Sequence, residues 1–275
     1  MRSHRSAPFL LLTAPLILFL CVFYAYPVVA MLMDSVHPPG WTVAEFGALA
    51  GSHVFWRVMQ VTGEISLIVT VACLVLAWPL AYGMARLPAA RANLLMVLVL
   101  VPFWTSILVR TYAWMALLGR RGIINNLLLW LGVVDRPLTL LNTRFSVCLA
   151  MVHVLLPFMA LSVASTLETL DLRLEEAAGV LGASPLRTFW AITFPLSLEG
   201  LVTGSILVFC LSIGSFVTVL LLGKTSTMIL PLLIYQQLTV SSDWPFAAAM
   251  GVVLLVLVST VLWSQSFLRP RWMRA

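Results

Sequence analysis

The chain has 275 residues, of which 61% are apolar and only 9% are charged, whereas soluble domains carry about 25% charged residues. This composition excludes an ordinary soluble protein and predicts an integral membrane protein, with one membrane domain over 1–275 accounting for the length. The net charge of +6 is explained by basic residues held on the cytoplasmic side of a membrane, so we expect no nucleic-acid partner.

Six apolar stretches are long enough to cross a bilayer, which takes about 20 helical residues. They predict an all-α fold with spans at approximately 8–33, 60–85, 93–118, 144–167, 196–222 and 246–268. The first stretch has a rival reading as a cleaved signal peptide, because Val28-Val29-Ala30 resembles a cleavage site. Its apolar run exceeds the roughly 7–15 residues of a signal core, so we expect a retained helix. Ile123 to Val133 is too short to span and predicts a short interfacial helix.

Six spans place both termini and the loops after spans 2 and 4 on one side of the membrane. That side holds nine of the sixteen Lys and Arg residues, the opposite loops hold six, and Arg110 lies within a span. The positive-inside rule therefore predicts that both termini of this multi-pass membrane protein are cytoplasmic.

The longest polar interruption lies between spans 4 and 5, at 168–195. Apolar residues at helical spacing predict an amphipathic helix from Glu168 to Leu181, with Glu176 facing outward. Gly182 is placed to end this helix as a C-cap glycine, and Ser184-Pro185 to begin the next one as an N-cap followed by proline. Pro195 is expected to mark the return into the membrane. The sequence thus predicts a helix–Gly–helix elbow.

The elbow carries a recognisable motif. Glu176-Ala177-Ala178, Gly182, Ile192 and Pro195 resemble, in type and spacing, the cytoplasmic loop motif of ABC importer permeases, with Phe194 in place of the usual leucine. This resemblance implies the type I permease fold and an elbow that docks into a groove of a cytoplasmic ATPase. The ATPase-coupling residues it implies are Glu176, Ala177, Ala178, Gly182, Ser184 and Arg187.

A second set of segments resembles the spermidine/putrescine-type subfamily of these permeases. The segments are Pro102–Ser106, Val109–Trp114, Leu155–Met159 and Asp243–Pro245. The resemblance implies a pore shared with a second permease subunit, a cytoplasmic ATPase dimer that binds the ATP, and an external substrate-binding protein. The implied cargo is a polyamine or a related small organic cation. The alternative is that this chain is an ABC importer permease for another small solute, such as iron, a phosphonate, an opine or an amino-acid derivative.

Arg110 is the most unusual residue within a span. Burying an arginine at mid-span costs about 2.5–3.5 kcal/mol, so its side chain should meet a partner or water. It is either a residue of the translocation path or half of an ion pair with Glu64. Glu64 lies near a helix end, where it either meets a cationic cargo or reaches water. The possible path residues are Glu64, Phe103, Trp104, Arg110, Tyr112 and Asp243. His153 is better explained as a buried histidine with one hydrogen bond than as a proton relay.

The sequence favours a membrane subunit that is not an enzyme. Gly223-Lys224-Thr225 resembles the end of a phosphate-binding loop, but Thr218 stands where that motif requires glycine. We therefore expect no cofactor or nucleotide site in this chain, and no catalytic cluster stands out. A self-sufficient secondary transporter is the other class considered. It needs ionisable groups near the midplane, and the spans offer only Glu64, Arg110, His153 and Glu199.

Overall fold

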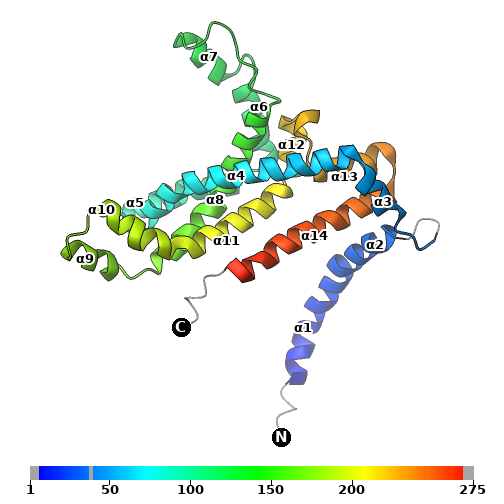
Figure 1. Cartoon of the computed structure of the whole chain (residues 1–275), viewed down its shortest axis with the longest axis horizontal. Coiled ribbons are helices and arrows are strands. Elements are labelled where there is room, and N and C mark those ends of the chain that lie inside the picture. The colour runs from blue at the N-terminus through cyan, green and yellow to red at the C-terminus, as the bar shows by residue number, and fades with distance from the viewer. Residues whose placement is uncertain (1–5, 37–39, 269–275) are drawn as a thin grey trace. The chain divides into compact units, whose positions relative to one another are not determined.

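The computed structural model describes residues 6–36 and 40–268, and within those ranges it contains only helices and the loops that join them (Figure 1). The chain divides into two compact units. Unit 1 comprises Met1–Trp56 and Leu233–Val256, and unit 2 comprises Arg57–Leu232 and Leu257–Ala275. The basic residues of the two termini, on which the predicted orientation partly depends, lie outside the described residues: Arg2, Arg5, Arg269, Arg271 and Arg274.

Unit 1 is built from the first helices of the chain and from the segment that begins its last helix. The elements are α1 (Ser6–Leu20), the π-turn η1 (Cys21–Ala25), α2 (Tyr26–Asp34), α3 (Ala44–Gly51), the first residues of α4 (His53–Arg86), the end of α13 (Leu230–Gln236), the π-turn η5 (Gln237–Ser241) and the start of α14 (Trp244–Leu268). The backbone of α14 approaches α2 closely at Gly251, because a Cβ there would lie 2.9 Å from the sulfur of Met31. The absence of a side chain at Gly251 is therefore what lets these two helices touch.

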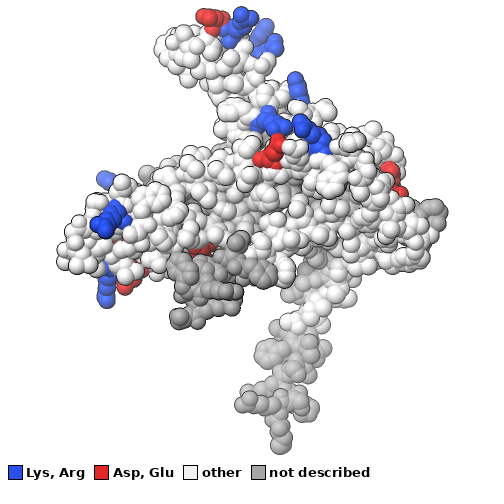
Figure 2. Space-filling model, in the orientation of Figure 1, with Lys and Arg blue, Asp and Glu red and all other residues white. Residues whose placement is uncertain are grey.

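Unit 2 holds most of the remaining elements. They are α4 (His53–Arg86), α5 (Ala89–Leu100), η2 (Val101–Trp104), α6 (Ile107–Leu118), α7 (Ile123–Trp130), α8 (Arg144–Glu168), α9 (Arg173–Val180), α10 (Pro185–Thr188), η3 (Phe189–Thr193), α11 (Phe194–Ile213), α12 (Phe216–Leu222), η4 (Thr225–Thr227) and the start of α13 (Leu230–Gln236). Within this unit, charged side chains gather around the α9–α10 elbow and around α7, with uncharged surface between them (Figure 2). Such a surface is suited to hydrocarbon.

Helix α8 is the centre of unit 2, and twelve of its 25 residues are buried. It packs against α11 at two glycines, Gly200 and Gly204. A Cβ at Gly200 would lie 2.8 Å from the carbonyl oxygen of Ser162, and one at Gly204 would lie 2.8 Å from the sulfur of Met159. The Ser162 hydroxyl donates a hydrogen bond of 3.0 Å to the carbonyl of Gly200. Two small residues four apart bring the helices into backbone contact, a common solution in membrane bundles.

Among the described residues, five helices are long and apolar enough to cross a membrane, or six if one bent pair counts as a single span. Helices α4, α8 and α14 cover the predicted second, fourth and sixth spans, and α4 begins earlier, at His53. The predicted third span, 93–118, is not one helix. Ala89–Trp104 and Ile107–Trp130 meet at 98°. The backbone is extended at Thr105 and Ser106, and the Ser106 hydroxyl accepts a hydrogen bond from the amide of Leu108 as an N-cap.

The fifth span also differs from its prediction of 196–222. The apolar helical run begins at Pro185 and ends at Ile213, and a break at Gly214-Ser215 separates it from α12. Pro195 does not mark a turn, because the helix runs through it. The π-turn η3 precedes Pro195, and the amide of Phe194 bonds to the carbonyl of Phe189. A wider turn accommodates a residue that has no N–H to donate and whose ring would crowd a regular turn.

Candidate functional site

The break between α5 and α6 places Arg110 and several aromatic side chains on one exposed stretch of unit 2. Phe103 is 43% exposed, Trp104 76% and Tyr112 57%. Arg110 is half-buried, and its Nε is buried without a hydrogen-bond partner in the described part of the chain. Three of the predicted path residues are therefore exposed on the same stretch of chain as an arginine whose buried Nε has no hydrogen-bond partner among the described residues.

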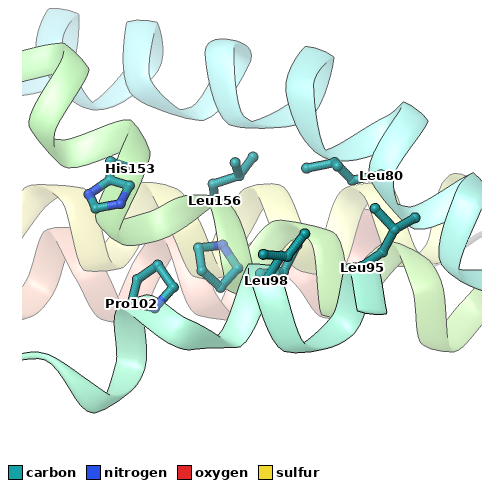
Figure 3. Close-up of a pocket in the computed structure, with 8 residues that line it drawn as sticks. Leu80, Leu95, Leu98, Pro102, His153 and Leu156 are labelled. Atoms are coloured by element: carbon teal, nitrogen blue, oxygen red, sulfur yellow. The ribbon is translucent and has the colours of Figure 1, made fainter. Parts of the chain in front are cut away.

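A small apolar cavity lies beside this stretch. It has a volume of about 260 Å³ and is lined by Leu80, Leu95, Leu98, Val99, Pro102, His153, Leu156 and Pro157 (Figure 3). His153 is the polar residue of this lining. Its Nδ1 accepts a hydrogen bond of 3.3 Å from the indole Nε1 of Trp114. His153 has the expected single hydrogen bond to a neighbour, but it is half-buried rather than fully buried.

The ion pair considered between Arg110 and Glu64 is not formed. The carboxylate of Glu64 is bound instead by Arg144, at 2.8 Å, and by the side-chain amide of Gln60, at 2.8 Å. Arg144 begins α8, so the pair joins the start of α8 to α4. Asp243 belongs to unit 1, where its carboxylate accepts a hydrogen bond of 3.1 Å from the amide of Phe246 and caps α14. Both carboxylates proposed for the path thus already have partners.

The predicted elbow forms between α9 and α10, and its turn is a Schellman motif. Gly182 has φ +84°. Its amide bonds to the carbonyl of Gly179 at 3.0 Å, and the next amide, of Ala183, bonds to the carbonyl of Ala178 at 2.9 Å. These are the two bonds that define a helix end closed by a left-handed glycine. Ser184 then caps α10 by accepting a hydrogen bond of 3.4 Å from the amide of Arg187.

The first helix of the elbow is shorter than predicted. It begins at Arg173 rather than at Glu168, which is the last residue of α8. The carboxylate of Asp171 accepts a hydrogen bond of 3.0 Å from the amide of Arg173. An aspartate side chain that binds an amide two residues ahead replaces a helical bond, so a short loop separates α8 from α9.

The tip of the elbow exposes apolar side chains that the chain itself does not cover. Val180 is 89% exposed, Leu181 87% and Leu186 69%. Glu176, Ala177, Gly182, Ser184 and Arg187 are also exposed, and Ala178 is half-buried. Among the predicted coupling residues, all but Ala178 are therefore open to a partner.

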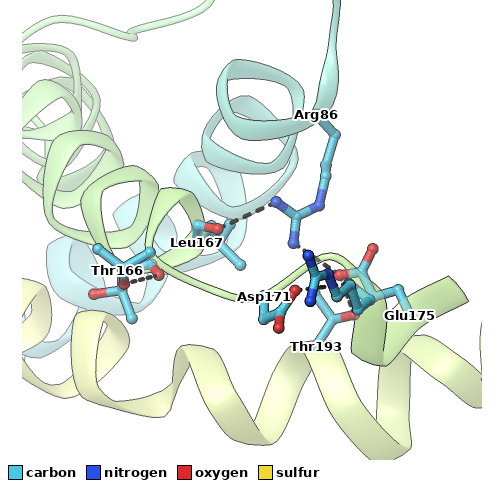
Figure 4. Close-up of polar contacts among 8 residues, drawn as sticks. Arg86, Thr166, Leu167, Asp171, Glu175 and Thr193 are labelled. Carbon is cyan, nitrogen blue, oxygen red and sulfur yellow. Dashed lines mark hydrogen bonds and ion pairs between the residues drawn. The ribbon is translucent and has the colours of Figure 1, made fainter. Parts of the chain in front are cut away.

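A polar clamp that the sequence did not predict fastens the base of the elbow. The guanidinium of Arg86, at the end of α4, donates to the carboxylate of Glu175 at 2.8 Å and to the carbonyl of Leu167 at 3.1 Å (Figure 4). The hydroxyl of Thr193 donates to the same carboxylate at 3.0 Å. These bonds connect α4, α8, α9 and η3. The side chains of Arg86 and Glu175 are only 13% and 20% exposed.

The electrostatics of the clamp favour an ionised Glu175. Burial by itself raises the pKa of this carboxyl group. The hydrogen bonds from Arg86 and Thr193 and the positive charge of Arg86 together outweigh burial, so the pKa lies below its usual value. At neutral pH the clamp is therefore a charge-assisted pair, which is stronger than a neutral hydrogen bond.

The family of this chain is decided by residues 46–274, which match the family described as "Binding-protein-dependent transport system inner membrane component". The chain belongs to this family. It is thus a multi-pass inner-membrane permease component of an ABC importer and, as expected, not itself an enzyme.

Three permeases of named transport systems are similar to this chain. The spermidine/putrescine transport system permease protein PotB of Escherichia coli (strain K12) is 38% identical over 209 residues, which cover 76% of this chain and 76% of the relative. The Haemophilus influenzae protein of the same name is 32% identical over 240 residues, covering 87% and 79%. The molybdenum transport system permease protein ModB of Mycobacterium bovis is 30% identical over 244 residues, covering 88% of each chain.

A solved structure shares the fold of the permease. A chain of the bacterial ABC transporter involved in import of the acidic polysaccharide alginate matches with a TM-score of 0.83 and 19% identity, covering 97% of both chains. The same transporter in complex with its alginate pentasaccharide-bound periplasmic protein matches with a TM-score of 0.84. These matches establish the ABC permease fold for this chain.

Proposed function

We propose that this permease forms, together with a second permease subunit, the path through which an ATP-driven importer takes up spermidine, putrescine or a related small organic cation. The similarity to PotB over three-quarters of both chains carries this proposal. ATP binds to a cytoplasmic ATPase dimer, and a periplasmic binding protein delivers the cargo.

The elbow is the element proposed to receive the motion of the ATPase. Its apolar tip, formed by Val180, Leu181 and Leu186, is exposed, and an exposed apolar patch suits a protein interface. Glu176, Ala177, Ala178, Gly182, Ser184 and Arg187 surround this tip as the proposed contact residues. The clamp of Arg86 on Glu175 joins α9 to the ends of α4 and α8, so the elbow moves with the spans as a rigid lever.

The proposed path binds its cargo weakly. Phe103, Trp104 and Tyr112 offer aromatic faces, which attract organic cations, whereas Arg110 repels them. Glu64 and Asp243, the carboxylates proposed for the path, are engaged by Arg144 and by the start of α14. A path of this kind passes a cation onward without holding it, which suits an importer whose binding protein selects the cargo.

Uptake by the reconstituted complex tests the cargo. Proteoliposomes that contain this permease, its sister subunit and the ATPases should accumulate radiolabelled spermidine when ATP and the binding protein are present. Unlabelled putrescine should compete, and molybdate should not. The ModB relative makes an oxyanion the specific alternative. Uptake of an anion or a metal with no polyamine uptake would refute the cargo and leave the permease assignment intact.

Arg110 provides a second test. Its loss strands no carboxylate among residues 6–36 and 40–268, because the carboxylate of Glu64 is bound by Arg144. Arg110→Gln should therefore assemble and express at the wild-type level while its uptake rate changes. Failed assembly of Arg110→Gln, measured by size-exclusion chromatography of the complex, would show that Arg110 is structural.

Orientation is tested by labelling. We propose that the elbow and both termini face the cytoplasm. In a background that lacks Cys21, Cys73, Cys148 and Cys210, a single cysteine at position 42 should react with an impermeant thiol reagent in intact cells. A single cysteine in place of Ser184 should react only after the cells are opened. Labelling of that second variant in intact cells would contradict the coupling role.

A further inference from the structure

A polar pocket lies at the end of unit 2 opposite the elbow. It has a volume of about 410 Å³ and is lined by Leu118, Arg120, Thr139, Leu140, Leu141, Asn142, Thr143 and Lys224. The pocket adjoins the first residue of α8, whereas the elbow follows its last residue. The 25 residues of α8 span about 37 Å at 1.5 Å per residue, which is more than the hydrocarbon thickness of a bilayer. The pocket and the elbow thus lie on opposite sides of the membrane.

Hydrogen bonds fix the walls of the pocket. The buried side chain of Asn125 donates to the carbonyls of Gly119 and Leu138, both at 3.0 Å, and accepts from the amide of Leu138 at 2.8 Å. The hydroxyl of Ser146 donates to the carbonyl of Leu222 at 3.3 Å, which ties α8 to the end of α12. The amide of Lys224 donates to the hydroxyl of Thr227 at 2.7 Å. A preformed pocket loses little entropy when a ligand enters.

The two basic residues of the pocket come from different loops, and both are exposed. Neither forms an ion pair within the described part of the chain, where the ion pairs are Arg86–Glu175 and Arg144–Glu64. This end of unit 2 is positive as a whole. Its basic residues are Arg57, Arg120, Arg121, Arg136, Arg144 and Lys224, and its acidic residues are Glu64 and Asp135. Figure 2 shows blue side chains gathered on and below α7.

We propose that this pocket binds a carboxylate side chain on the surface of the substrate-binding protein. The proposal rests on the proposed function, because it takes the side opposite the elbow to be the periplasmic side. The hydroxyl of Thr143 already donates to the carbonyl of Leu140 at 2.7 Å. The lining still offers a guanidinium, an ammonium, the side-chain amide of Asn142 and the hydroxyl of Thr139. These are donors that match the two acceptor oxygens of a carboxylate.

The positive charge of the pocket favours an acidic partner over a cationic cargo. A polyamine is repelled by Arg120 and Lys224, so the pocket is not a cargo site. A protein that holds a polycation in its cleft needs carboxylates there, and acidic groups at the rim of that cleft complement a positive permease surface. Complementary charges of this kind fix the register of two docking proteins and speed their encounter. The pocket thus aligns the open cleft of the binding protein with the path.

Charge reversal tests the pocket. Arg120→Glu and Lys224→Glu should each weaken binding of the polyamine-loaded binding protein by about tenfold, and the double variant by about a hundredfold. Binding is measured by interferometry on the complete transporter in phosphatidylcholine nanodiscs. The binding protein used is the one that stimulates ATP hydrolysis by the wild-type complex. The matched control is the double variant Arg121→Glu with Arg136→Glu, which changes the charge of the same face equally but lies outside the pocket lining.

The control should weaken binding by less than about threefold, and all variants should keep the basal ATPase activity and thermal stability of the wild type. Equal weakening by both double variants would reduce the effect to the general charge of the face and overturn the pocket. Unchanged binding to Lys224→Glu and Arg120→Glu would also overturn the pocket. A weakening of binding seen only in phosphatidylglycerol nanodiscs would overturn it too, since a lipid headgroup would then be the ligand. A wild-type complex that binds this protein but takes up no polyamine refutes the cargo and leaves the pocket measurable.

Discussion

The clamp at the base of the elbow predicts that Glu175→Ala uncouples ATP hydrolysis from transport. The substitution removes two hydrogen bonds from the Glu175 carboxylate and leaves Arg86 with the carbonyl of Leu167. Removing one partner of a fully buried ion pair costs about 3–5 kcal/mol, and a hydrogen bond to a charged group contributes about 1.5–3 kcal/mol. Both side chains are slightly exposed, so we expect Glu175→Ala to cost about 2–3 kcal/mol. This cost raises the population of the state with a detached elbow about 30- to 160-fold.

Two measurements check this prediction. Hydrogen exchange of the α9 amides in nanodiscs should be faster in Glu175→Ala, and less cargo should be imported per ATP hydrolysed. Glu168→Ala is the matched control, because Glu168 is exposed and lies on the same side of the membrane at the end of α8. Thr193→Val removes one bond of 3.0 Å and should cost about 1 kcal/mol.

The paired variant Glu175→Leu with Arg86→Leu should be less impaired than either single variant, because no buried charge is then left alone. Wild-type exchange and wild-type coupling in Glu175→Ala, with Glu168→Ala behaving the same way, would refute the role of the clamp.

The same clamp makes a prediction about pH. Because the folded pKa of Glu175 lies below its usual value, which is about 4.3, its contribution is complete above that value. It is lost as the pH falls through the folded pKa. The difference in thermal stability between the wild type and Glu175→Gln should thus be constant from pH 5 to 8 and shrink below about pH 4. A difference that first disappears near neutral pH would contradict this assignment.

Three further predictions concern the turn, the helix packing and the outer ion pair. The side chain of Gly182→Val would meet no neighbouring atom, but the residue must adopt φ +84°, which strains a valine by about 1–2 kcal/mol. Gly182→Val should therefore lower co-purification with the ATPase, and Gly182→Asn should lower it less. Gly200→Ala places a methyl group 2.8 Å from a backbone carbonyl and should reduce thermal stability by about 1–3 kcal/mol, whereas Gly63→Ala, with open space around it, should not. The Glu64–Arg144 pair is 36% and 43% exposed, so a double-mutant cycle on expression and stability should give a coupling below about 1 kcal/mol, and a larger coupling would mean that the pair is shielded in the complex.

The sequence by itself determined the elbow turn and the apolar helices. The turn at Gly182 and the cap at Ser184 depend on hydrogen bonds that reach at most five residues along the chain. The residue types at those positions therefore specify the geometry directly. A helix of about 20 apolar residues is likewise favoured locally, because only a helix satisfies its backbone in hydrocarbon.

Proline positions did not predict correctly where the helices break. Pro195 predicted a turn and Pro102 did not, yet the chain runs straight through the first in a π-turn and bends by 98° just after the second. At each proline the backbone can either continue as a helix through a wider turn or break the helix. Packing against the neighbouring helices determines which of the two forms. A proline marks a position where a helix loses a backbone hydrogen bond, but it does not decide whether the helix continues or bends there.

Only the tertiary structure decided the partners of the charged residues. Glu175 and Arg86 are 89 residues apart, and Glu64 and Arg144 are 80 apart. The sequence offered Glu64 as a candidate partner of Arg110 because both lie within spans, and left open a role for both in the path. It missed the clamp because Glu175 differs from its neighbour Glu176 only in the direction it faces. The side of α9 that a carboxylate occupies depends on where α4 and η3 end in space. No local propensity encodes that placement, and it decides which charges fasten the elbow and which remain open to a partner.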